Sequence, residues 1–125
     1  MNSLPNSDGV LEVGKANFET EVIRSQQPVL VVFWAPWSGA CRAFASTMNE
    51  VKSAAAPNVK LVRINADHNP ELSLWYGIQS LPTLVCFVEG AVRGRIVGTT
   101  SKEAILAQLE SATRSHGASP TLTSP

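Results

Sequence analysis

Residues 29–41 read Val-Leu-Val-Val-Phe-Trp-Ala-Pro-Trp-Ser-Gly-Ala-Cys. The first part, Val29–Trp34, is continuously apolar and rich in β-branched residues, which is typical of a central strand covered on both faces. Ser38 then offers a hydroxyl that can cap a long helix over about residues 39–56. A buried strand, a short turn and a long helix in this order predict an α/β fold.

The flanking segments continue the alternation of strands and helices. Strands are expected at residues 10–13, 59–65, 83–88 and 91–97, and helices at 17–25, 69–76 and from 100 onward. Asn17 is expected to cap the first helix, and residues 100–103 (Thr-Ser-Lys-Glu) have the spacing of a capping box for the last. Strands separated by helices pair parallel, whereas the tight turn Glu89-Gly90 makes an antiparallel hairpin. The sequence therefore predicts a mixed central sheet of about five strands flanked by four helices.

The charge balance bears on the kind of partner. The chain of 125 residues has ten Lys and Arg and ten Asp and Glu, so its formal net charge is zero. This argues against a nucleic-acid or membrane surface built on long-range attraction. No segment reaches the length of a transmembrane helix. We therefore expect no nucleic-acid partner and no membrane association.

The cysteines, histidines and chain ends bear on compartment, cofactors and domains. Two cysteines and no secretory signal in residues 1–9 predict free thiols in the reducing cytoplasm. The two cysteines and two histidines lack the spacing of a zinc site, so no metal and no other cofactor is expected. One domain is expected over residues 10–114, between flexible tails at 1–9 and 115–125.

Several motifs together resemble the thioredoxin family over nearly the whole chain outside the tails. Residues 33–37 (Phe-Trp-Ala-Pro-Trp) match the approach to that family's Trp-Cys-Gly-Pro-Cys turn, and residues 65–70 match the exit of its third strand. Residues 76–84 match the loop that carries its cis-proline, which implies a cis bond at Leu81–Pro82. The resemblance implies the thioredoxin fold and a relation to cell redox homeostasis and protein disulfide exchange.

The chain departs from the family at positions that carry chemistry. The attacking cysteine of the family is Ser38 here, and the proline between its two cysteines is Ala40. The buried aspartate that the resemblance would place under the active site is Val32. The proline that kinks the long helix is Ser46, and the partner lysine appears as Arg63.

These departures change what the catalytic position can do. Dithiol exchange needs an outer thiolate that attacks a client disulfide and a second thiol that releases the client. The outer position is Ser38, whose hydroxyl needs an adjacent base to become a nucleophile and cannot form a disulfide. We therefore expect Ser38 to act as a structural N-cap, and dithiol exchange to be lost or severely weakened.

The remaining thiols and Arg63 each have two interpretations. Cys41, one turn into the helix, is expected to face inward, and inert packing is favoured over residual thiol chemistry. Cys86 lies in an apolar strand and is expected in the core, without pairing to Cys41. Arg63 is expected to send its guanidinium to solvent, the alternative being a place beside Cys41 that favours the thiolate.

The client-binding groove of the family is expected to persist. In that family the cis-proline loop presents backbone groups to an extended client, in the manner of strand addition. Those backbone groups do not depend on the residue at position 38. The residues that the resemblance assigns to the groove are Trp37, Gly39, Ala40, Leu81, Pro82 and Gly98.

Three functions stay open at this point. The favoured one is a binding module for extended protein or peptide clients. The second is a redox protein or oxidation sensor that works through Cys41 alone, forming a mixed disulfide with glutathione or a client. The third is an ordinary disulfide oxidoreductase whose attacking cysteine was replaced with serine, against which the further departures at Val32, Ala40 and Ser46 count.

Overall fold

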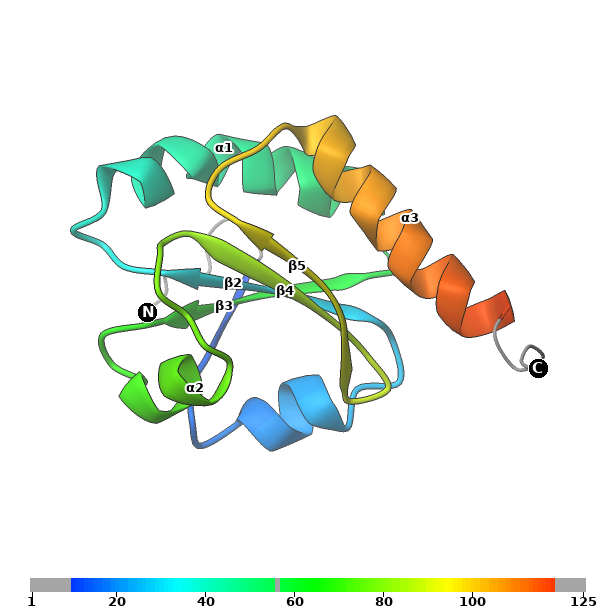
Figure 1. Ribbon diagram of the computed structural model, residues 1–125, viewed down its shortest axis with the longest axis horizontal. Helices are drawn as coiled ribbons and strands as arrows, with labels where there is room; N and C mark the ends of the chain where they lie inside the picture. The colour runs from blue at the N-terminus through cyan, green and yellow to red at the C-terminus, as the bar shows by residue number, and fades with distance from the viewer. Residues whose placement is uncertain (1–9, 56, 119–125) are drawn as a thin grey trace.

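The computed structural model describes residues 10–55 and 57–118, with side chains up to Thr113 (Figure 1). Its elements follow the expected order of strands and helices. They are β1 (Leu11–Val13), η1 (Glu19–Ile23), β2 (Val29–Trp34), α1 (Gly39–Ala55), β3 (Lys60–Asn65), α2 (Pro70–Trp75), β4 (Thr83–Val88), β5 (Ala91–Val97) and α3 (Lys102–Ala118).

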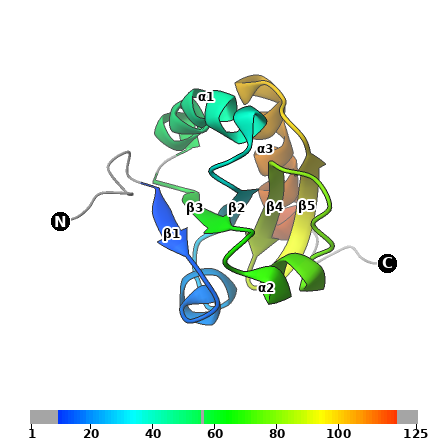
Figure 2. The same ribbon diagram turned by 90° about the vertical axis from the view of Figure 1, so that its left-hand side faces the viewer.

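The five strands form one mixed sheet in the order β1-β3-β2-β4-β5. β3 pairs parallel with both β1 and β2, whereas β4 runs antiparallel to β2 and to β5. Helices α1 and α3 cover one face of the sheet, and η1 and α2 lie against the other (Figures 1 and 2). The predicted α/β fold, with a five-stranded mixed sheet and four helices, is confirmed.

The central position of β2 in the sheet explains why its sequence is apolar without alternation. Leu30 and Val32 belong to the buried cluster under α1 and α3, while Val29, Val31 and Phe33 belong to the cluster on the opposite face. All five are buried, because both faces of the sheet carry helices. Burying such a side chain fully contributes about 1.5–3 kcal/mol to folding.

Helix α1 carries the candidate site at its first turn and is unbroken over Gly39–Ala55. Phe44, Met48 and Val51 are buried on the face toward the sheet. Ser46 is exposed, and as a serine it keeps the backbone N–H that a proline would remove from the helix interior. The helix is therefore continuous from the candidate site at its first turn to Ala55.

The first helix differs from its prediction. It is a single π-helical stretch, and its first turn receives no side-chain cap. The predicted cap at Asn17 is wrong, because Asn17 Oδ1 accepts the N–H of Gly14 at 2.8 Å and so closes the preceding turn. Phe18 and Val22 are buried as expected.

Helix α3 differs from its prediction at both ends. Ser101 Oγ accepts the Ala104 N–H at 3.1 Å, so Ser101 is the cap and the capping box predicted at residues 100–103 is wrong by one position. The helix continues to Ala118, into the segment predicted as a tail from residue 115. The other predicted tail residues, 1–9 and 119–125, lie outside the described residues.

Two substitutions test which residue caps α3. Ser101→Ala should lower the free energy of unfolding by about 1 kcal/mol, because the Ala104 N–H loses its acceptor. The matched variant Thr100→Ala should change it by less than about 0.5 kcal/mol. Urea denaturation of both variants measures the difference, and a larger loss for Thr100→Ala would contradict the assignment.

Candidate functional site

The turn between β2 and α1 places Ser38 at the start of the long helix. Ser38 Oγ accepts the N–H of Cys41 at 3.2 Å, and its carbonyl oxygen accepts the N–H of Arg42 at 3.1 Å. The Ser38 N–H itself donates to the carbonyl oxygen of Ala35 at 3.1 Å. Ser38 is thus the N-cap of α1, as predicted, a role worth about 1 kcal/mol.

The surroundings of Ser38 do not activate its hydroxyl. Although it occupies the outer position of the turn, the residue is only 7% exposed. In the described part of the chain, no carboxylate, imidazole or amine hydrogen-bonds the Ser38 hydroxyl. A serine without such a base is a poor nucleophile.

The two cysteines are free, and each is buried in a different place. Cys41 lies in the first turn of α1 at 8% exposure, lines a cavity toward the sheet, and its thiol has no hydrogen-bond partner among the described residues. Cys86 lies in β4 within the core, as predicted, and burial raises the pKa of its thiol to about 11. Cys86 therefore stays protonated at neutral pH.

The prediction that Arg63 sends its guanidinium to solvent is wrong, because the side chain is mostly buried and paired. Its Nε donates to Glu12 Oε1 at 2.7 Å, and its guanidinium carbon lies 4.8 Å from the ring centroid of Trp34. Trp34 Nε1 donates to the second Glu12 oxygen at 3.4 Å. The cause is strand register, since Glu12 and Val32 flank Arg63 on the two neighbouring strands. The sequence analysis did not identify Glu12 as a partner of Arg63. The one indication in the sequence was that a single acidic residue stands in a short apolar strand.

The loop before β4 forms the second part of the site. The Leu81–Pro82 bond is cis, as the resemblance implied. The Pro82 carbonyl oxygen accepts the Gly98 N–H at 2.8 Å, and Gly98 has φ +86°, a left-handed conformation that favours glycine. This hydrogen bond ties the loop to the end of β5.

The backbone of Leu81 is unused within the described chain. Neither its N–H nor its C=O makes a hydrogen bond to another described residue. The Leu81 side chain is half-buried beside them. One donor and one acceptor on the same residue form the unit that an added strand can pair with.

A shallow hollow of about 430 Å³ lies beside this loop. Its lining is mostly apolar and consists of Trp37, Ala66, Pro70, Ser73, Leu74, Ile78, Gln79 and Leu81. The other predicted groove residues lie outside this lining. Gly39 and Ala40 are exposed at the start of α1, Pro82 is buried, and Gly98 is half-buried.

Two tryptophans and a leucine are exposed around the hollow and on α2. Trp37 is 66% exposed, as predicted, and its Nε1 donates to Asp67 Oδ2 at 2.6 Å. Leu74 and Trp75 are 80% and 69% exposed. The sequence reasoning missed both, although α2 is too short to bury more than Leu72, and that length was the available signal.

Metal sites and membrane spans are absent from the described ranges. Over residues 10–55 and 57–118, no three His, Cys, Asp or Glu side chains are grouped closely enough to hold a metal ion. Within the same ranges, no helix is both long enough and apolar enough to cross a bilayer.

Known proteins resemble the chain over nearly all of this architecture. A family model described as Thioredoxin matches residues 9–111. A thioredoxin of Griffithsia pacifica is 42% identical over 101 residues, which cover 81% of this chain and 93% of that protein. Thioredoxin 1 of Synechococcus elongatus is 41% identical over 98 residues, or 78% and 92% of the two chains. A thioredoxin of Acidithiobacillus ferridurans is 38% identical over 105 residues, or 84% and 97%. The chain therefore belongs to the thioredoxin family of redox proteins.

Proposed function

We propose that this chain is a client-binding member of the family in which dithiol–disulfide exchange is lost or severely weakened. The observation that carries the proposal is the Ser38 hydroxyl, which accepts the Cys41 N–H where the attacking thiolate would have to be. The proposed clients are protein or peptide segments in an extended conformation. The proposed compartment is the cytoplasm, where both cysteines remain reduced.

The chemistry of exchange supports the loss of activity. In the first step a thiolate forms a new S–S bond to one client sulfur while the other client sulfur leaves as a thiolate. In the second step a neighbouring thiolate attacks the protein sulfur of that mixed disulfide, so that an S–S bond forms within the protein and the remaining client sulfur leaves as a thiolate. The residue at position 38 carries a hydroxyl, which can take part in neither step, and Cys86 is a protonated thiol in the core. Cys41 alone has no partner with which to complete the cycle.

The groove supports the binding role. Leu81 presents an unused backbone donor and acceptor, and the neighbouring hollow offers apolar contact through Trp37, Leu74 and Ile78. These features allow main-chain pairing for affinity and side-chain contact for selection. The client-contacting residues we propose are Trp37, Leu81 and Pro82, with Gly39, Ala40 and Gly98 at the rim.

A second candidate function rests on Cys41 itself. Its thiol has no hydrogen-bond partner in the described chain and lines a cavity that also contains the exposed residues Arg42 and Ala45. A small oxidised thiol such as glutathione disulfide could exchange there, with Cys41 forming the mixed disulfide and one glutathione leaving. The burial of Cys41 counts against this role, because exchange needs access to the sulfur.

Client binding can be tested with carboxymethylated insulin B chain as a model of an extended client. We expect a dissociation constant in the micromolar range or weaker, and a loss of about tenfold in Trp37→Ala, because an exposed aromatic anchor carries much of such an interface. Trp75→Ala is the matched control, since Trp75 is equally exposed but does not line the hollow. Fluorescence anisotropy measures both, and equal affinity of Trp37→Ala and the unchanged chain would contradict the proposed groove.

Thiol labelling separates the two candidate functions. With iodoacetamide at pH 8, Cys86 should remain unlabelled in the folded protein, because a pKa of about 11 leaves about 0.1% thiolate. Cys41 should react at least about tenfold more slowly than free cysteine, because it is buried. Mass spectrometry of timed samples gives both rates, with labelling in urea as the control for complete reaction. Labelling of folded Cys41 as fast as free cysteine would favour the single-thiol function instead.

A further inference from the structure

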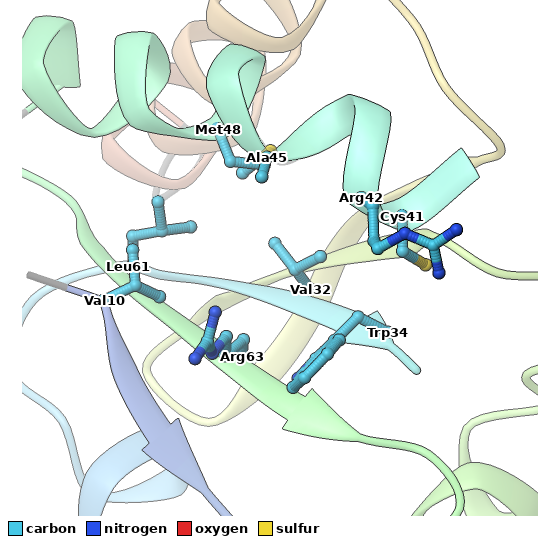
Figure 3. A pocket seen from close by; sticks show the side chains of 9 residues that line it. All are labelled: Val10, Val32, Trp34, Cys41, Arg42, Ala45, Met48, Leu61 and Arg63. Atoms are coloured by element: carbon cyan, nitrogen blue, oxygen red, sulfur yellow. The ribbon is translucent and has the colours of Figure 1, made fainter. Parts of the chain in front are cut away.

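A cavity of about 190 Å³ lies between the first turns of α1 and the sheet, and Figure 3 shows the side chains around it. It shares no residue with the hollow beside Leu81. Its lining consists of Val10, Val32, Trp34, Cys41, Arg42, Ala45, Met48, Leu61 and Arg63. It is therefore a separate space, which the proposed client binding does not use.

The secondary structure explains why the body of this cavity is apolar. Val32 and Trp34 are two residues apart on β2, and Leu61 and Arg63 are two apart on β3, so each pair faces α1. Met48 closes the cavity from the helix side (Figure 3). Val32 lies beside Arg63 in register and contributes only methyl groups. The part of the lining formed by Val32, Leu61 and Met48 thus offers dispersion contacts.

The charged groups of the cavity are unbalanced. Arg42 and Arg63 line it, and no carboxylate does. Arg63 is paired with Glu12, whereas Arg42 makes no ion pair within the described chain and donates only to the Pro36 carbonyl oxygen, at 2.7 Å. A guanidinium has five N–H donors, so Arg42 retains several for a ligand. Arg42 is exposed, and Figure 3 shows its guanidinium beside Cys41 at one end of the lining, turned away from Val32.

The volume limits the size of the ligand. An engineered apolar cavity of about 150 Å³ holds benzene, so the space here admits one six-membered ring or a short alkyl chain with a small head group. We propose that the cavity binds a small organic monoanion, an arenecarboxylate or short-chain carboxylate. Its apolar body contacts Val32, Leu61 and Met48, and its carboxylate lies toward Arg42.

Cys41 offers an independent readout of this site. Its thiol belongs to the cavity wall, is more than nine-tenths buried, and has no hydrogen-bond partner among the described residues. A bound ligand should therefore cover the sulfur. Benzoate should slow modification of Cys41 by methyl methanethiosulfonate at least about threefold, while leaving the rate for free cysteine unchanged.

Benzoate and its neutral isostere benzamide are the probes for the main experiment. Titration of the ¹⁵N-labelled full chain should shift the amide signals of Val32, Cys41 and Arg63, with a dissociation constant for benzoate at or below about 1 mM. Benzamide should bind at least about fivefold more weakly, because it lacks the charge that Arg42 attracts.

Two variants and a control locate the site. Arg42→Gln should weaken benzoate about fivefold and change benzamide by less than about twofold, because it removes the positive charge and leaves Val32, Leu61 and Met48 in place. Ala45→Leu, at an exposed helix position whose side chain borders the cavity, should abolish binding of both probes by filling the space. Arg93→Gln removes an exposed charge outside the lining and should leave both affinities unchanged.

Three results would each overturn the proposal. One is equal affinity for benzoate and benzamide in the unchanged chain. Another is the absence of shifts at Val32, Cys41 and Arg63 at about 20 mM benzoate, which would leave the cavity to water. The third is a set of shifts centred on Trp37 and Leu81, which would assign benzoate to the hollow beside the cis-proline loop.

Discussion

The first turn of α1 has one side-chain cap, the hydrogen bond from the Cys41 N–H to Ser38 Oγ. A helix N-terminus presents free backbone N–H groups and a partial positive charge, which stabilise a thiolate at this position. A hydroxyl stays neutral there and serves as the acceptor that completes the cap. One atom therefore decides whether this position attacks a client or only begins a helix, and here it is oxygen.

Two other parts of the molecule, the cis-proline loop and the cavity under α1, do not depend on the atom at position 38. The loop at Leu81–Pro82 is tied to β5 through Gly98. The unused backbone N–H and C=O of Leu81 do not depend on which side chain occupies position 38. Between α1 and the sheet, Val32 and Arg63, which pairs with Glu12, belong to the lining of a cavity that contains two arginines and no carboxylate. The proposed client groove and the proposed anion site thus use different parts of the same scaffold.

The secondary-structure elements that the sequence predicted correctly are those set by residues close together in the chain. The bounds of β2, β4 and β5 follow from unbroken apolar runs and a tight turn, and the structure has them at the same residues. The cap of α3 was misplaced because Thr100 and Ser101 are adjacent and chemically similar, so that backbone geometry alone selects Ser101. The Asn17 cap failed for a different reason, since its side-chain oxygen accepts the N–H of Gly14 in the preceding turn.

The parts of the site that could not be predicted depend on contacts between distant segments. Arg63 meets Glu12 because β1 and β3 pair in one register, which polarity patterns do not specify. The cavity above Val32 depends on how far α1 stands from the sheet. The exposure of Leu74 and Trp75 depends on where a short helix sits, whereas the cap at Ser38 and the exposure of Trp37 follow from the turn sequence itself.

Reduction of insulin disulfides tests the central claim most directly. With dithiothreitol as the electron source, the unmodified chain at micromolar concentration should precipitate the insulin B chain no sooner than dithiothreitol alone. A family member with the Trp-Cys-Gly-Pro-Cys turn serves as the positive control. Catalytic acceleration by the unmodified chain that disappears in Cys41→Ser would contradict the account, because it would show turnover without a sulfur at position 38.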